Sequence, residues 1–299
     1  MRLRTRAALA ALDLVRAAPR ALARPLAWPL AALLFAVLER KVTLANVARV
    51  FPRWPRGRRW KLAFHAYLQA ARSLMEFFQA DRYTDAEMKE RVAVDPRDED
   101  LFVRALAEGR GALILTGHLG NWAWLARRAE AGGYALAALS KAPKDPALGA
   151  RLRRIQGFTT IDYGETRELV RWLRAGKPLA ILMDQEPASR REGAVVPLLG
   201  QPTLTHTGAF RLARLTGAPM FTVFLLRLGP GRHHAWVEPF EASRNPDPER
   251  ALAEDAARFN ARLEKVIREA PDEWLWMYGR WRRLDRMRAR EAAAAERAG

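Results

Sequence analysis

The sequence predicts an α/β fold with a mostly parallel central sheet flanked by helices, preceded by an N-terminal helical segment that associates with a membrane. From Gly111 onward, short apolar runs alternate with amphipathic stretches, the pattern of strands joined by crossover helices. With 299 residues and 49% hydrophobic side chains, the chain can bury one large core. It contains no cysteine, and its histidines show no zinc-type spacing, so neither a disulfide nor a metal is expected.

The apolar runs and amphipathic stretches predict the elements of this fold in turn. The predicted strands are Ala112–Thr116, Tyr134–Leu139, Thr159–Asp162, Pro178–Met183, Met220–Leu226 and His234–Glu238. The predicted helices are Asn121–Ala131, Ala147–Gln156, Thr166–Ala175, Thr207–Thr216 and Asp255–Glu269. The end of the chain, Arg283–Gly299, is rich in Arg, Glu and Ala, so a polar helix that frays is expected there.

Three helical stretches are predicted before the sheet, with prolines near their limits. They are Arg6–Leu22, Leu26–Val47 and Trp60–Ala80. The charged stretch Asp81–Asp100, which contains Pro96, is expected to connect them to the sheet. We therefore divide the chain into basic N-terminal helices over 1–60, an α/β domain over 61–285 and a polar helical tail over 286–299.

Positive charge is concentrated near the N-terminus. The net charge is +18, and the part up to Lys61 holds fourteen Lys and Arg against two acidic residues. Such an excess attracts nucleic acid or an anionic membrane surface. The fourteen uncharged residues Pro25–Leu38 favour the membrane, and basic residues interleaved with aromatic stacking platforms, typical of nucleic-acid binders, are not seen. Because a spanning helix needs about 20 apolar residues, an interfacial helix is expected; the alternative is a pair of ordinary amphipathic helices covering the core.

His118 is the residue that points most directly to chemistry. It follows the predicted buried strand Ala112–Thr116 and precedes a helix that begins near Asn121, at the sheet edge where open α/β folds build their sites. A histidine there is either a structural side chain or a general base that removes a proton from a hydroxyl group. The glycines beside it allow close backbone approach, and the helix start offers free amides to an anionic group, which favours the base.

The stretch from Gly117 to Ala123 resembles the His-x4-acid motif of the lysophospholipid acyltransferase superfamily. It is closest to the lipid A biosynthesis (lauroyl) acyltransferase family, whose version reads Gly-His-Phe-Gly-Asn-Trp-Glu. The acid position is Ala123 here. In the family this acid is thought to orient the imidazole and stabilise its charged form, as a carboxylate does in hydrolase triads. The resemblance therefore implies an inactive or very slow form.

Three explanations for Ala123 remain open. They are an engineered inactivating substitution, a naturally silent lipid-binding relative, and rescue by another carboxylate, for which Glu130 and Asp184 are candidates. The motif is otherwise intact, which favours the first. Introducing a carboxylate at position 123 would distinguish an inactivated enzyme from a silent relative. Activity would appear only if the rest of the site is competent.

Further motifs follow in the family's order and spacing, and together they are more specific than any one of them. Asp184 and Gln185 match the family's Asp-Gln, which is followed here by Arg190, a Val-Pro-Leu-Leu-Gly stretch and Thr216-Gly-Ala-Pro. The stretch Pro271–Arg282 resembles the family's closing Pro-x-x-Trp-Leu-Trp-x-x-x-Arg-Trp-Lys, and we expect a helix that packs on the sheet there.

The resemblance implies substrate-binding roles for Asn121, Asp184, Gln185, Arg190 and one arginine before Gly157, of which we choose Arg154. It implies a peripheral enzyme, or one with a single N-terminal anchor, on the cytoplasmic face of the cell membrane. The enzyme would move an acyl group from acyl-carrier protein or acyl-CoA to a hydroxyl of a glycolipid or lysophospholipid, with no other cofactor. The alternative is a catalytically silent lipid-binding protein of the same fold.

Overall fold

The computed structural model describes residues 13, 16–17, 19–140, 145, 149–150 and 158–298. The strands are β1 (Val92–Val94), β2 (Ala112–Thr116), β3 (Ala137–Ser140), β4 (Thr159–Asp162), β5 (Pro178–Leu182), β6 (Gly193–Leu198), β7 (Gln201–His206), β8 (Met220–Gly229) and β9 (Arg232–Phe240). The α-helices are α2 (Ala23–Val37), α3 (Arg40–Val50), α4 (Arg56–Phe78), α5 (Asp85–Arg91), α6 (Pro96–Ala107), α7 (Trp122–Ala131), α9 (Thr166–Arg174), α10 (Gly208–Thr216), α11 (Pro248–Glu269) and α12 (Arg282–Ala298). The 3-10 turns are η1 (Arg20–Leu22), η2 (Ala80–Arg82), η3 (Arg190–Glu192) and η4 (Pro271–Glu273).

A seven-stranded sheet with the order β1-β9-β8-β2-β5-β3-β4 forms the centre of the protein. Its strands β8, β2, β5, β3 and β4 run parallel, whereas β9 is antiparallel to β8 and carries β1 beside it. The prediction of a mostly parallel sheet is therefore confirmed. All six predicted strands are present in this sheet.

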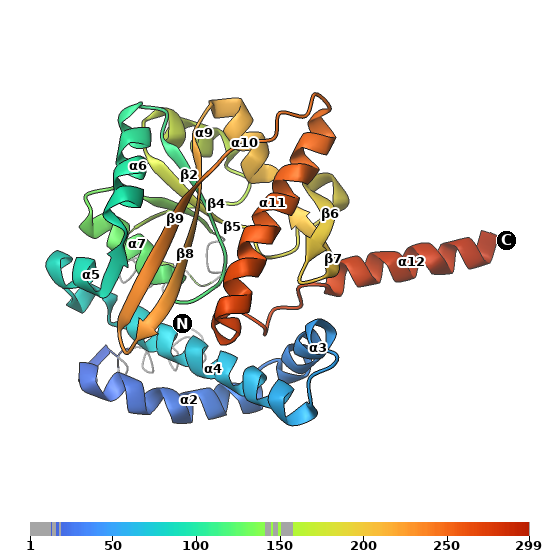
Figure 1. Cartoon of the computed structure of the whole chain (residues 1–299), viewed down its shortest axis with the longest axis horizontal. Coiled ribbons are helices and arrows are strands. Elements are labelled where there is room, and N and C mark those ends of the chain that lie inside the picture. The colour runs from blue at the N-terminus through green and yellow to red at the C-terminus, as the bar shows by residue number, and fades with distance from the viewer. Residues whose placement is uncertain are drawn as a thin grey trace.

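The strand β2 lies in the middle of the core, and all five of its residues are buried. Leu113 and Leu115 point to the side packed by α9, α10 and α11, while Ile114 points to the side packed by α6 and α7. Both faces are covered because helices cross over a parallel sheet on both sides, which explains the uninterrupted apolar run (Figure 1).

The N-terminal helices pack against one end of this layered body, where α2 lies along α4 (Figure 1). The predicted single helix Leu26–Val47 is wrong, because α2 ends at Val37 and α3 begins at Arg40. A distant contact holds α3: the Asn46 side chain donates to the carbonyl groups of Trp276 and Tyr278, at 2.9 and 2.8 Å. Among the described helices, none is long and apolar enough to cross a membrane.

Two stretches contain regular structure that was not predicted from the sequence. The segment Asp81–Asp100 holds α5 and β1 and the start of α6, whose first turns are capped by Thr84 and Asp95. Thr84 and Asp95 are both residue types that commonly start helices. These two helix starts were not recognised, because the segment was interpreted from its charge alone. The antiparallel hairpin β6–β7 was not predicted, because its apolar residues were interpreted only as a motif.

The closing motif Pro271–Arg282 is not the predicted helix. Only η4 is helical there, and Leu119 and Trp274 pair as an isolated antiparallel bridge. The helix begins later, at Arg282, and α12 projects away from the sheet (Figure 1). The predicted helices Arg6–Leu22 and Ala147–Gln156 lie mostly outside the described residues.

Candidate active site

His118 and Asp184 meet because two neighbouring strands end at the same level. In the β2–β5 ladder Thr116 pairs with Leu182, so each of the two residues lies two positions beyond its strand. The backbone N–H of Met183 donates to the carbonyl of Thr116 at 2.8 Å, which extends the ladder toward them. The side chains therefore converge at the carboxyl edge of the parallel strands, where sites form in open α/β sheets.

Asp184 holds His118 by two hydrogen bonds. The imidazole Nδ1 lies 2.8 Å from Oδ1 of Asp184, and the backbone N–H of His118 donates to Oδ2 at 2.9 Å. The indole of Trp274 also donates to Oδ2, at 3.0 Å. Burial opposes ionisation of this carboxyl, but the charge of His118 and these hydrogen bonds outweigh it and lower the pKa of Asp184. An ionised Asp184 accepts only, so Nδ1 of His118 is the donor, and a ring whose one proton is on Nδ1 has a lone pair on Nε2.

The imidazole borders a cavity of about 290 Å³ between α4, the loop before α7 and the segment after η4. The Trp122 ring meets the imidazole edge to face, with centroids 5.4 Å apart, and fixes its orientation. The cavity wall is largely apolar, with Ala70, Phe77 and Met277 among its side chains. The arrangement suits the removal of a proton from a group bound in this cavity.

Ala123 lies in this cavity wall and is 7% exposed. The position where the family has its acid is thus beside His118, as expected, but it presents only a methyl group. Of the two rescue candidates, Glu130 is exposed on α7 and pairs with Arg127 at 3.5 Å. Asp184 is the one that contacts His118, and this contact favours rescue among the three explanations for Ala123.

The other predicted site residues lie in different environments. Asn121 lines the cavity, but its side-chain amide donates to Glu76 at 2.8 Å and so fixes the loop. Gln185 is half-buried directly after Asp184. Arg190 is exposed on η3, pairs with Glu291 of α12 and does not line the cavity. Arg154 falls outside the described residues.

Three acidic and aromatic side chains at the site were not assigned a role from the sequence. Trp274 was interpreted as packing alone, although a buried indole N–H needs a partner and here finds Asp184. Glu76 of α4 accepts from Asn121 and from Arg227. Glu273 lines the cavity and accepts from the backbone N–H of Arg227; burial raises its pKa to about 7 against the effect of that arginine. Glu76 and Arg227 are far apart in the sequence, and only the fold brings them together.

The loop that carries His118 requires glycine at position 120. Gly120 has φ +60°, and a Cβ there would lie 1.8 Å from the carbonyl oxygen of Leu225. Its backbone N–H donates to the carbonyl of Glu273 at 2.9 Å. The loop therefore passes between β8 and η4 with no room for a side chain.

A histidine held by a carboxylate lies at this edge of the α/β sheet and faces a largely apolar cavity. Residues 3–283 match the model of the family described as "Bacterial lipid A biosynthesis acyltransferase". The chain therefore belongs to this family, which supports transfer of an acyl group to a lipid acceptor. Among the described residues, no three His, Asp or Glu side chains gather as a metal site would require.

Individual proteins are also similar to this chain. The chain is 23% identical over 258 residues to "Lipid A biosynthesis palmitoleoyltransferase" of Escherichia coli (strain K12), and the match covers 82% of this chain and 80% of the relative. The values are the same for "Lipid A biosynthesis acyltransferase" of Shigella flexneri. Among solved structures, the 1-acyl-sn-glycerophosphate (LPA) acyltransferase PlsC from Thermotoga maritima matches with a TM-score of 0.36 and 14% identity, over 82% of this chain and 98% of that one.

Proposed function

We propose that this protein is a membrane-peripheral O-acyltransferase in which His118, oriented by Asp184, is the general base. The acceptor is a hydroxyl of a glycolipid or lysophospholipid, and the donor is an acyl thioester of acyl-carrier protein or coenzyme A. The observation that carries the proposal is the 2.8 Å contact between Nδ1 of His118 and Asp184. It leaves Nε2 as the proton acceptor.

The proposed reaction uses this contact. Nε2 of His118 takes the proton of the acceptor hydroxyl as its oxygen attacks the thioester carbonyl carbon. Asp184 stabilises the resulting imidazolium, and the tetrahedral oxyanion is stabilised by the backbone amides of Trp122 and Ala123 in the first turn of α7. When the tetrahedral intermediate collapses, the C–S bond breaks, the thiolate leaves and takes the proton, and the new ester remains.

An apolar cavity of about 100 Å³ supports binding of the acyl chain beside this site. It lies between the sheet and the helices α6 and α7, and Phe102, Ala126 and Val223 are among its lining side chains. Trp122 lines both this cavity and the one at His118. An acyl chain that passes Trp122 would leave its thioester carbonyl near Nε2.

The outer face of α2 supports attachment to a membrane. Ala27 and Ala31 face α4 and are fully buried, while Trp28, Leu33 and Val37 are 49%, 59% and 67% exposed. A soluble helix usually keeps polar residues on its outer face, so exposed apolar side chains flanked by basic residues suit the bilayer interface. The segment Pro25–Leu38, which includes this face, contains no charged residue.

The direct test is acyl transfer by the purified full-length chain, with acyl-carrier protein and coenzyme A thioesters as donors and a lipid A precursor and a lysophosphatidate as acceptors. We expect transfer, and we expect His118→Ala to abolish it while donor affinity changes by less than about twofold, because the base acts in the transition state. A variant that keeps the wild-type rate would exclude His118 as the base.

The silent lipid-binding protein remains the second candidate, since Ala123 replaces the family's acid. Lipid binding without any transfer, by the wild type and by the Ala123→Glu variant alike, would establish it and overturn the proposed enzyme.

A further inference from the structure

The helix α12 leaves the body of the protein and packs on it only through its first turns (Figure 1). Leu284 is fully buried, whereas the arginines of the later turns are exposed. Residues 292–295 are all alanine, the residue with the highest helix propensity, so the helix can form without core packing. The match to the family model ends at residue 283, and the family therefore assigns no role to most of α12.

Three arginines of α12 lie along one side of the helix, and we call them the arginine stripe: Arg286, Arg290 and Arg297. Residues four and eleven positions apart return to nearly the same side of a helix, because about 3.6 residues make one turn. At a rise of about 1.5 Å per residue, the arginine stripe extends over about 17 Å of the helix axis. It therefore presents three guanidinium groups in an almost straight line.

The acidic side chains of α12 do not neutralise the arginine stripe. Asp285 pairs with Arg49 of α3 at 2.6 Å. Glu291 pairs with Arg190 of η3 at 3.1 Å, and Glu296 lies about a quarter turn away from the arginine stripe. The side chains of the arginine stripe make no ion pair or hydrogen bond with any residue that the structure describes. Two of the acids thus hold α12 to the body, while the positive charge of the arginine stripe stays available to an anion.

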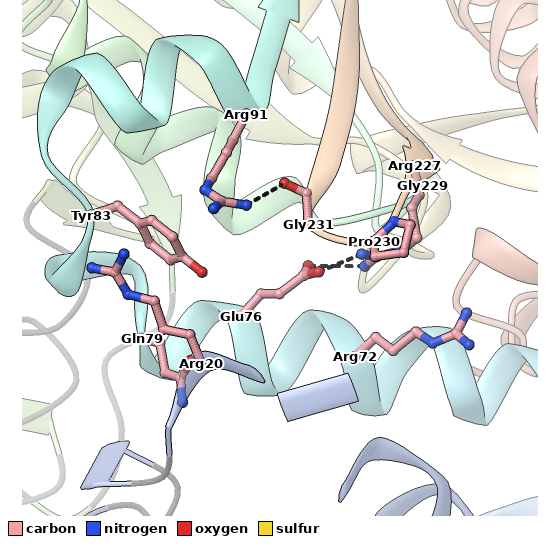
Figure 2. Close-up of a pocket in the computed structure, with 10 residues that line it drawn as sticks. All are labelled: Arg20, Arg72, Glu76, Gln79, Tyr83, Arg91, Arg227, Gly229, Pro230 and Gly231. Carbon is pink, nitrogen blue, oxygen red and sulfur yellow. Dashed lines mark hydrogen bonds and ion pairs between the residues drawn. The ribbon is translucent and has the colours of Figure 1, made fainter. Parts of the chain in front are cut away.

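Other arginines of the protein are engaged inside the fold. In the pocket beside α4, Arg227 pairs with Glu76, and Arg91 donates to the carbonyl of Gly231 at 3.2 Å (Figure 2). Such guanidinium groups hold elements of the chain together. Those of the arginine stripe extend into solvent instead, where a partner outside the chain can reach them.

The arginine stripe faces the side of α12 on which α2 ends. Arg282 lies one turn before the arginine stripe, on the same side of the helix, and its side chain is 3.5 Å from Glu39. Glu39 directly follows Val37 and Leu38, which are 67% and 48% exposed. The free positive charge of α12 therefore adjoins the exposed apolar end of α2, and one surface can meet both.

We propose that the arginine stripe binds the anionic head groups of a lipid bilayer. Guanidinium groups bind phosphate oxygens with charge-assisted hydrogen bonds, and each basic side chain near an anionic leaflet adds to the attraction. The apolar face of α2 enters the bilayer interface, and α12 holds the protein to the same surface by charge. This contact involves neither acyl donor nor acceptor, so it does not rest on the proposed acyl transfer.

The test measures co-sedimentation of the full-length chain with vesicles that contain equal parts of phosphatidylglycerol and phosphatidylcholine. The stripe variant carries Arg286→Gln, Arg290→Gln and Arg297→Gln together. It should bind these vesicles at least about tenfold more weakly than the wild type, because three charges near the bilayer are lost. High salt should remove this difference, and vesicles of phosphatidylcholine alone should bind both proteins equally.

Two further variants serve as controls. The matched control replaces Arg167, Arg171 and Arg174 by Gln, since these three arginines are also exposed on one side of a helix, α9, at the opposite end of the molecule from α2 (Figure 1). It removes the same charge and should bind as the wild type does. Lysine at all three positions of the arginine stripe keeps the charge and the helix propensity, and it should also keep the binding.

Three outcomes would overturn this inference. Wild-type binding by the stripe variant would place the electrostatic contact elsewhere, and equal weakening by the α9 control would reduce it to net charge. If the stripe variant instead binds vesicles normally but has a raised KM for an acyl-carrier protein thioester and not for a coenzyme A thioester, the partner is an acidic protein and not a membrane. Vesicle binding that depends on the arginine stripe, without acyl transfer, would contradict the proposed function alone.

Discussion

At the scale of single residues, the site has two positions from which a carboxylate can serve His118. The family's acid follows the histidine on the same loop, whereas Asp184 comes from the end of the neighbouring strand. Asp184 is 3% exposed and accepts hydrogen bonds from His118 and Trp274. A carboxylate held in this way is pre-organised for an imidazolium, so the absence of an acid at position 123 need not abolish catalysis.

Asp184→Asn should lower kcat by roughly 100- to 10,000-fold, the range seen when the partner of a catalytic histidine is removed. The amide keeps the size of the side chain but can no longer stabilise the charged ring. Asp162→Asn is the matched control, because Asp162 ends β4 at the same edge of the sheet and is exposed. Equal loss in both variants, or no loss in either, would contradict the role of Asp184.

Ala123→Glu should change the transfer rate by less than about tenfold, because Nδ1 of His118 already has its carboxylate. Single-turnover rates with the same acyl thioester compare the two proteins. A gain of about 100-fold or more would show instead that this chain is an inactivated form that lacks only the family's acid.

The residues of the site could be predicted in part, and the limits have physical causes. His118 and Asp184 could both be identified as site candidates from the sequence, since each follows an apolar run that predicts a buried strand. Their contact was not, because it depends on the order β2-β5 in the sheet, which no local pattern encodes. The tryptophan that completes the site was assigned to packing, because its segment showed helical spacing but is held extended against Leu119.

At the scale of elements, the periodic parts of the fold were predictable and the connections were not. All six predicted strands of the sheet are present. In β2 and β8 long apolar runs are buried on both faces, which makes their pattern distinctive, whereas β4 has only one buried residue. The break between α2 and α3 carries no proline or glycine, and α3 is held by the distant hydrogen bonds of Asn46. Tertiary contacts overrode the local pattern there.

Replacing both Leu33 and Val37 by Gln should weaken binding to anionic vesicles about tenfold or more, because two exposed apolar side chains no longer enter the bilayer. Co-sedimentation with vesicles measures it. The matched control is Leu215→Gln on α10, since Leu215 is 60% exposed, close to the 59% of Leu33, and α10 lies at the opposite end of the molecule from α2 (Figure 1). Equal binding by the double variant and the control would place the attachment on another surface.

At the scale of the whole molecule, buried histidines couple stability to pH. Burial lowers the pKa of His206 and of His233 from 6.5 to about 4. Their neutral forms fit the fold, so the stability that they contribute is complete above pH 6.5 and is lost as the pH falls toward 4. For His233 the nearby Glu76 opposes this shift and Arg227 adds to it.

His233→Phe should therefore flatten the fall in unfolding free energy between pH 6.5 and pH 4, by up to roughly 1.4 kcal/mol per pH unit. Phe keeps the ring against Trp124, which lies 5.1 Å from the imidazole, and removes the group that titrates. Denaturant melts of both proteins across this range test it. Parallel pH profiles for the two proteins would show that His233 does not titrate on unfolding.

The pairing of Thr116 with Leu182 also has a consequence for how the protein acquires activity during folding. His118 and Asp184 are 66 residues apart in the chain, so their contact closes a long loop and cannot form while α7 and α9 are merely helical. A loop of this length carries an entropic cost that only the assembled sheet repays. The helical circular dichroism signal would thus recover early in refolding, whereas turnover would return only when β5 has docked beside β2. The recovery of turnover would therefore report specifically on the pairing of these two strands.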